Sequence, residues 1–251
     1  MPTNFTSTVL TLLVIGAVAY KIPFFSRRKL FHISLLQIMY FFIIPSMIFI
    51  FLNSYLLAIT ATPSSHLIAL SDFFLTNLIL LSTLLAFGGK AIHVVTKTLS
   101  ETALRDDKTE VGQINKYLHL KFSHNLMYIG GLLIILGLTL IEINHSPLPG
   151  TQNLTPQIVR GAVLGLFFVI SMYNYTVSRD KYTGRWADLK PVFFVSLICL
   201  GAVTFLVQRV DVPLRQYQLL IPALLGMGLI NAIPLLLLFR RVRTRRSRSS
   251  Q

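Results

Sequence analysis

Histidine and lysine side chains gather at the ends of several long apolar segments, and they are the residues in this sequence most suited to chemistry. The stretch KFSHN places His124 at the start of one apolar run, and Lys90 and His93 follow the end of another. His32 and His119 lie at comparable positions. Imidazole is a common metal ligand, and a lysine ammonium binds phosphate as a point charge. Such a group could therefore bind a metal, a haem or a phosphate-bearing molecule.

The spacing of these histidines argues against a metal. His119 and His124 are five residues apart, which separates their side chains by about 140° on an α-helix. The sequence has no HxxxH or HExxH motif and no carboxylate at ligand spacing. We therefore predict no metal ligand and no catalytic residue, and the sequence leaves any cofactor unknown. Contact with phosphate or lipid headgroups, or a structural role, is the favoured interpretation of the histidines.

A second set of polar residues lies inside the apolar segments. Four of them follow one helical face at intervals of 4, 7 and 7 residues: Asp72, Thr76, Thr83 and Lys90. An ionisable group inside a membrane helix is costly and marks a candidate site, so we expect this face to line the bundle interior or a wet cavity. The alternative is that Asp72 merely caps the helix. The candidate substrate-binding residues are Asp72, Lys90, His93, His124, Asn125 and Asn231.

Membrane helices are the elements that must position these side chains. Of 251 residues, 53% are hydrophobic and only 13% are charged, whereas a soluble domain carries about 25% charged residues. The apolar residues come in blocks of about 20, the length of a helix that crosses the hydrocarbon core. The single Cys199 lies in one such block, which excludes a disulfide framework. We predict an all-α polytopic integral membrane protein.

Seven spans are predicted, and together they form one transmembrane domain over residues 1–239. They lie near 6–25, 33–56, 67–88, 122–143, 157–177, 191–208 and 217–239. Ala17-Val18-Ala19 resembles a signal-peptidase site, but no basic residue precedes the first span, so we expect it to stay uncleaved. Gly161 and Gly165, four residues apart, predict close packing between helices, with a dimer interface as the alternative.

Lysine and arginine set the predicted orientation. Of 23 such residues, 20 fall in alternate connecting segments, and only Arg160, Arg209 and Arg215 fall in the others. The basic segments are 21–32, 89–121, 178–190 and 240–251. Cytoplasmic loops are enriched in lysine and arginine. The N-terminus is therefore expected outside and the C-terminus in the cytoplasm, in a plasma membrane or bacterial inner membrane.

Two cytoplasmic segments have patterns of their own. Apolar residues recur through 96–121 with charges between them, which predicts an amphipathic helix on the inner leaflet. The tail, 240–251, is strongly basic, and we expect it to bind anionic inner-leaflet lipids rather than nucleic acid. The predicted headgroup-binding residues are Arg240, Arg241, Arg243, Arg245, Arg246 and Arg248.

Three functions fit these patterns. The favoured prediction is a transporter or channel for a small solute or ion, with a polar path that joins Asp72 to His124. The second is a membrane enzyme or a lipid- or cofactor-binding protein, in which Lys90, His93 and His124 form a site open only to the cytoplasm. The third is a non-catalytic subunit that binds a membrane-protein partner or a second copy of itself. No motif in the sequence names a substrate.

Overall fold

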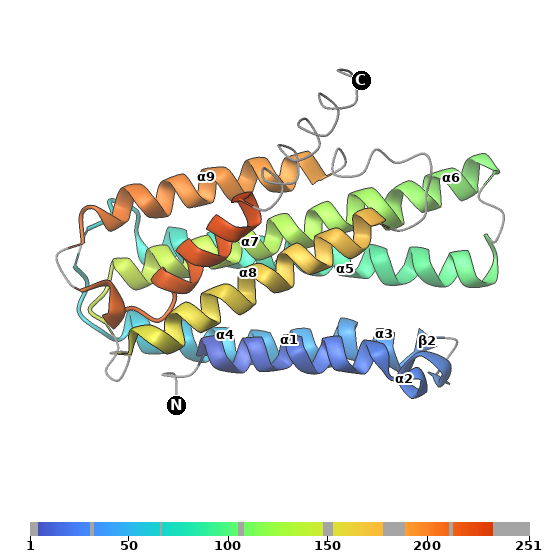
Figure 1. Cartoon of the computed structure of the whole chain (residues 1–251), viewed down its shortest axis with the longest axis horizontal. Coiled ribbons are helices and arrows are strands. Elements are labelled where there is room, and N and C mark those ends of the chain that lie inside the picture. The colour runs from blue at the N-terminus through green and yellow to red at the C-terminus, as the bar shows by residue number, and fades with distance from the viewer. Residues whose placement is uncertain are drawn as a thin grey trace, which may run out of the picture.

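The structure is an all-α bundle, as predicted. A computed structural model describes residues 5–30, 33–65, 67–104, 108–147, 153–177, 189–210 and 213–232. The long helices run side by side along the long axis of the molecule (Figure 1). Within the described residues the β-structure consists of one two-stranded pair, β1 (Lys29–Leu30) with β2 (Ile33–Ser34), and an isolated bridge between Ser64 and His145.

The helices follow one another along the chain with short connections. In order they are α1 (Phe5–Lys21), α2 (Pro23–Arg27), α3 (Leu35–Ile38), α4 (Ile44–Thr60), α5 (Asp72–Thr102), α6 (Glu110–Tyr117), α7 (Ser123–Ile143), α8 (Leu154–Val177) and α9 (Lys190–Val207). Two π-helical segments, η2 (Met39–Ile43) and η3 (Leu118–Phe122), join α3 to α4 and α6 to α7. A 3-10 turn, η5 (Leu214–Gln216), precedes a final helix, here named the C-terminal helix (Leu220–Ala232).

Five helical stretches in the described part of the chain are long and apolar enough to cross a membrane. They are Leu35–Thr60, Asp72–Glu101, Glu110–Ile143, Leu154–Met172 and Lys190–Val207. Two shorter apolar helices, Ser7–Gly16 and Leu220–Ala232, fall within the first and last predicted spans. Large apolar side chains point outward from the long helices, with Phe73 80% exposed and Leu57 73% exposed. Such surfaces fit a lipid environment, where outward apolar side chains carry no cost.

Glycines allow α5 and α7 to approach closely. A Cβ atom on Gly130 would lie 2.7 Å from the Ser82 carbonyl oxygen, and one on Gly89 would lie 2.7 Å from the Ser123 carbonyl oxygen. Neither helix could keep this separation with a larger residue at those positions, because backbone atoms fill the space. This close pair forms the centre of the bundle and carries Lys90, His93 and His124.

The predicted packing role of Gly161 and Gly165 is confirmed. A Cβ on Gly161 would lie 2.8 Å from the Leu225 Cβ, and one on Gly165 would lie 2.9 Å from the Leu229 Cβ. These two glycines of α8 therefore form the contact with the C-terminal helix.

The predicted amphipathic segment, 96–121, is divided between two long helices. Residues up to Thr102 extend α5, and α6 continues through η3 into α7. The α5–α6 hairpin reaches beyond the ends of α8 and α9 (Figure 1). The Asn115 side chain ties the hairpin together, because it donates to the Thr96 carbonyl oxygen at 3.0 Å and to the Ser100 Oγ at 2.7 Å. Val111 and Ile114 lie on the exposed face of α6.

Candidate functional site

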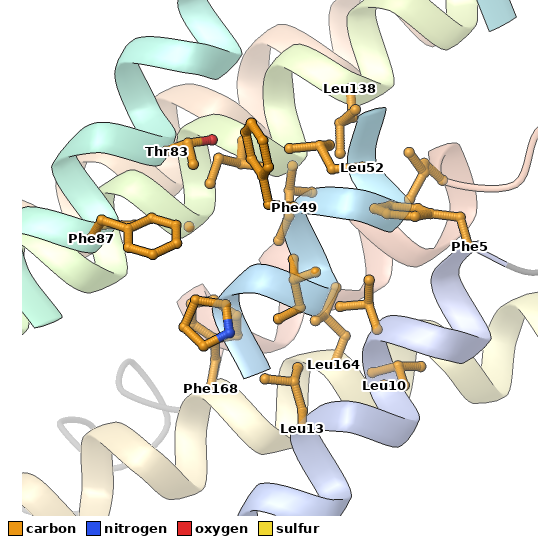
Figure 2. A pocket seen from close by; sticks show the side chains of 18 of the residues that line it. Phe5, Leu10, Leu13, Phe49, Leu52, Thr83, Phe87, Leu138, Leu164 and Phe168 are labelled. Carbon is orange, nitrogen blue, oxygen red and sulfur yellow. The ribbon is translucent and has the colours of Figure 1, made fainter. Parts of the chain in front are cut away.

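An apolar cavity of about 280 Å³ lies inside the bundle, between α1, α4, α5, α7 and α8 (Figure 2). Leu13, Phe49, Phe87 and Phe168 point into it from four of these helices (Figure 2). The Thr83 hydroxyl in the wall donates to the Ile79 carbonyl oxygen at 2.8 Å, so its polarity is satisfied within its own helix. The cavity is therefore built to hold an apolar group.

Lys90 is the one charged residue among those that line this cavity. Its Nζ lies 4.5 Å from the centre of the Tyr40 ring, which belongs to η2. Within the described part of the chain, Lys90 forms no ion pair. An ammonium in a membrane bundle is costly unless an anion or a dipole compensates it, and an aromatic face supplies only part of that compensation. This lysine gives the cavity a polar end that can attract an anion.

Three imidazole rings meet one helical turn beyond Lys90. The His93 ring centre lies 4.5 Å from that of His119 and 4.9 Å from that of His124. The His119 and His124 rings are stacked, with centres 6.3 Å apart and planes 7° apart. We name His93, His119 and His124 the histidine cluster. In the described residues the buried Nδ1 atom of His93 has no hydrogen-bond partner.

The sequence-based prediction that His119 and His124 diverge is wrong. The angle of about 140° assumes an α-helix, but residues 118–122 form the π-helical segment η3. A π-helix closes its hydrogen bonds over five residues instead of four, so residues five apart come onto one side. The Nδ1 atom of His124 lies 3.0 Å from the His119 carbonyl oxygen, which fixes the second ring beside the first.

Aromatic rings connect the histidine cluster to the cavity. The Tyr128 ring lies one turn after His124 on α7, with its centre 6.2 Å from that of His124. The Phe168 ring of α8 lies 6.0 Å beyond Tyr128 and forms part of the cavity wall. Sequence reasoning missed Phe168, because its partner Tyr128 lies on another helix. Lys90 thus belongs to the cavity wall, whereas the histidine cluster adjoins that wall without lining the cavity.

This region does not form a metal centre as arranged. The part of the chain that the structure describes contains no group of three His, Cys, Asp or Glu side chains that could hold a metal ion. What the cluster offers is a set of ring nitrogens, each able to donate a hydrogen bond or to accept one. Its chemistry suits a polar or anionic group that approaches from the cavity.

The other candidate residues fall into different environments. Asn125 adjoins His124 and donates from Nδ2 to the Lys121 carbonyl oxygen at 2.9 Å. Asn231 donates to the Ser196 Oγ at 2.9 Å and to the Met227 carbonyl oxygen at 2.8 Å, which joins the C-terminal helix to α9. The structure thus brings together Lys90, His93 and His124. His32 and the six tail arginines lie outside the described residues.

Asp72 lies at the opposite end of the bundle. Its Oδ2 atom is 2.9 Å from the Nε2 atom of His145, and its Oδ1 accepts from Asn144 at 3.5 Å. Ser71 caps the same helix end by accepting from the Phe74 N–H at 3.2 Å. These contacts connect the start of α5 to the end of α7. Ser71, and not Asp72, is therefore the N-cap of α5, and the Asp72 carboxylate is engaged by residues that follow α7.

Glu142 is a buried carboxylate whose role the sequence does not reveal. Its Oε1 accepts from the Tyr55 hydroxyl at 2.8 Å and from the Gln218 N–H, and its Oε2 accepts from the Leu219 N–H at 2.8 Å. These N–H groups precede the C-terminal helix, whose first turn has unsatisfied donors and a partial positive charge. Glu142 therefore anchors the start of that helix.

Five helices in the described part of the chain have the length and the apolar composition to cross a membrane, which suggests an α-helical multi-pass membrane protein. No family model matches the chain, and neither the curated proteins nor the solved structures contain a significant match. The function is therefore argued from the cavity, Lys90 and the histidine cluster.

Proposed function

We propose that this protein binds a membrane amphiphile, with the apolar chain in the cavity and an anionic headgroup at Lys90. The observation that carries the proposal is the position of Lys90, a cation without an ion pair among the described residues, in the wall of an otherwise apolar cavity. A small polar solute would make no favourable contact with the apolar wall, and a small apolar solute would leave the Lys90 ammonium without a counter-charge. A lipid matches both, and the surrounding bilayer supplies lipids at high concentration.

The size of the cavity supports one chain. About 280 Å³ is close to the lower end of the roughly 300–1,000 Å³ that small-molecule pockets occupy. Phe87 of α5 and Phe168 of α8 line this space together with Leu10 and Leu13 of α1 (Figure 2). A single acyl or alkyl chain therefore fits this space better than a two-chain phospholipid.

Two observations favour lipid binding over the transport predicted from the sequence. A polar path would have to join Asp72 to His124, yet the cavity between them is lined by apolar side chains apart from Thr83 and Lys90. The Asp72 carboxylate is also engaged by His145 and Asn144. These contacts give Asp72 a structural role, so Lys90 is the charged residue that we assign to the proposed lipid site.

We also propose the seven-span arrangement with the N-terminus outside. Support comes from the basic residues that end α1, lie in α6 and begin α9: Lys21, Lys116 and Lys190. The end of α1 and the start of α9 point toward the same side of the molecule as the α5–α6 hairpin (Figure 1). Cytoplasmic segments are enriched in lysine and arginine. In this orientation Lys90 and the histidine cluster lie toward the cytoplasm.

The test is lipid binding to the full-length protein in a mild detergent, measured with radiolabelled tetradecyl phosphate and with radiolabelled tetradecanoate. Leu13→Trp fills the cavity from α1, whereas Val14→Trp places the same side chain on an outward position that is 48% exposed. We expect Leu13→Trp to abolish binding of both ligands and Val14→Trp to leave it unchanged. Equal binding by the two variants would exclude the cavity as the chain site.

Lys90→Met tests the headgroup contact. Loss of a hydrogen bond to a charged group costs about 1.5–3 kcal/mol, so both ligands should bind roughly ten- to a hundredfold more weakly. Lys190→Met is the matched control, because Lys190 is an exposed lysine at the start of α9. A similar loss in both variants would mean that general surface charge, and not Lys90, attracts the lipid.

A further inference from the structure

We infer that the histidine cluster makes this site selective for a phosphate headgroup, so that the ligand is a single-chain lipid phosphate monoester. The inference rests on the proposed function and names the ligand class of the same site. Its basis is the juxtaposition of three imidazoles with one ammonium: Lys90 lines the cavity, and the histidine cluster lies one helical turn beyond it, outside the residues that line the cavity.

The number of donors separates phosphate from carboxylate. A phosphate monoester carries about −1.5 to −2 charges near neutral pH and three strong acceptor oxygens, whereas a carboxylate carries one charge on two oxygens. Lys90 supplies one positive charge, and the neutral imidazoles of His93 and His119 can each donate one N–H, whereas the N–H of His124 is directed at the His119 carbonyl oxygen. A carboxylate can accept about four hydrogen bonds on its two oxygens, so the advantage of a phosphate here is its third oxygen and its additional charge.

The charges around the cluster favour the more highly charged anion. Lys97 lies one turn beyond His93 on α5. Lys121 lies in η3, between His119 and His124 in the sequence. Glu101, the next acid along α5, pairs with Lys29 of β1 at 3.8 Å. The cations near the cluster therefore outnumber the acids in the part of the chain that the structure describes.

Irregular backbone on two helices independently marks the same place. Tyr40, the ring beneath Lys90, lies in η2, and His119 lies in η3. π-Helical turns are rare, because a regular α-helix is the more favourable conformation. Those that do occur are frequently found at functional sites. Here η3 is what brings His119 beside His124, and a regular helix would turn the ring away. The backbone irregularity thus serves to assemble the donor group.

The buried Nδ1 atom of His93 points to the same conclusion. It makes no hydrogen bond to any described residue, although a buried polar atom normally has a partner. His93 stands between His119 and His124, with edge-to-face contacts to both rings. A headgroup oxygen that enters from the Lys90 side would give this nitrogen its partner.

Competition binding tests the inference on the detergent-purified, full-length protein. Radiolabelled tetradecyl phosphate is displaced in turn by tetradecyl phosphate, tetradecanoate, tetradecanol and inorganic phosphate. We expect tetradecyl phosphate to compete at least about tenfold better than tetradecanoate, because the extra oxygen and charge engage further donors. Tetradecanol and inorganic phosphate should compete weakly. A difference below about twofold between the two anionic lipids would overturn phosphate selectivity.

The double substitution His119→Gln with His124→Gln assigns the selectivity to the cluster. It should reduce the affinity for tetradecyl phosphate about tenfold and leave that for tetradecanoate within about twofold of wild type, so the carboxylate lipid also reports that the protein is folded. If the double variant binds neither lipid, the single His119→Gln variant decides by the same comparison. Retained phosphate preference would assign selectivity to Lys90 alone and overturn the role of the histidines.

The outcomes also separate this inference from the proposed function. If the Leu13→Trp variant loses both lipids but wild type shows no phosphate preference, the cavity holds a lipid and only the headgroup assignment fails. If inorganic phosphate displaces the label as well as tetradecyl phosphate does, the ligand is free phosphate and the lipid assignment fails. If the Leu13→Trp and Val14→Trp variants bind alike, the proposed function itself fails.

Discussion

Glu142 is the buried acidic residue in the described part of the chain. Its contacts explain how a carboxylate is accommodated inside an apolar bundle. It is only 4% exposed and joins Tyr55 of α4 to the backbone that opens the C-terminal helix. Its two oxygens share three donors, and the positive end of a helix lies next to them. The sequence shows Glu142 near the end of a predicted span, but it cannot show which helix begins beside it.

Replacing Glu142 with glutamine should destabilise the protein by about 1–3 kcal/mol, because the new amide can accept at one position only and leaves buried N–H groups unsatisfied. Tyr55→Phe removes a single hydrogen bond from the same group and should cost about 0.5–1.5 kcal/mol. The measurement is the free energy of unfolding in detergent micelles. A Glu142→Gln variant as stable as wild type would show that this carboxylate does not anchor the C-terminal helix.

At the same scale, Lys90 and Asp72 show what residue types alone can predict. Both are costly charges on one face of a predicted helix, and on that pattern they were assigned to one path. The structure gives Asp72 a partner in His145 and places the Lys90 ammonium over Tyr40. The difference depends on neighbours from other segments of the chain, which periodicity along a single helix cannot supply.

At the scale of elements, the apolar blocks predict two helices to within one residue and misplace boundaries of others. The predicted span 122–143 agrees with α7, and 191–208 agrees with α9 within one residue. The predicted third span ends at residue 88, yet α5 continues to Thr102. The pair Gly88-Gly89 looks like a helix end in the sequence, but Gly89 instead allows α5 to touch the Ser123 backbone of α7.

The π-helical segments could not be predicted, since neither contains a proline or glycine that signals an irregular turn. Each adds one residue to a turn and rotates everything that follows relative to a regular α-helix. The predicted divergence of His119 and His124 is therefore wrong because of the backbone conformation, and not because of the chemistry of the side chains. This is why the candidate site was predicted in part: Lys90 and His93 lie on one regular helix, whereas His119 depends on η3.

The packing of α5 on α7 gives a prediction with a matched control. Gly130→Ala should destabilise the protein by about 1–3 kcal/mol, because its Cβ would meet backbone atoms of α5 at 2.7 Å and force the helices apart. Gly201→Ala in α9 has no atom within 4 Å of the new Cβ, and it should be neutral or stabilise the helix by up to about 1 kcal/mol. Thermal unfolding in micelles compares the two. Equal effects would contradict close packing at Gly130.

At the scale of the whole molecule, the cavity arises where separate parts of the chain meet. Its walls come from α1, α4, α5, α7 and α8 (Figure 2). The sequence predicts the apolar character of each wall, but it does not show which helices become neighbours. Hydropathy therefore predicts the class of protein, while the location of a ligand chain requires the tertiary structure.

The predicted orientation can be tested with two single cysteines placed at opposite ends of α7. Ser146 follows α7 and is exposed, and Gln113 is exposed on α6. The native Cys199 is 1% exposed, so its reaction with an aqueous reagent should be negligible, and a Cys199→Ser background confirms this.

We expect a membrane-impermeant maleimide to label the Ser146→Cys variant in intact cells and to label Gln113→Cys only after permeabilisation, because the basic segments face the cytoplasm. The reverse pattern would place Lys90 and the histidine cluster outside, where they could not reach a lipid of the inner leaflet. Labelling of both variants in intact cells would mean that α7 does not cross the membrane. The reverse pattern would contradict the predicted orientation, and labelling of both variants in intact cells would contradict the number of spans. The outcome therefore decides which part of the seven-span arrangement stands.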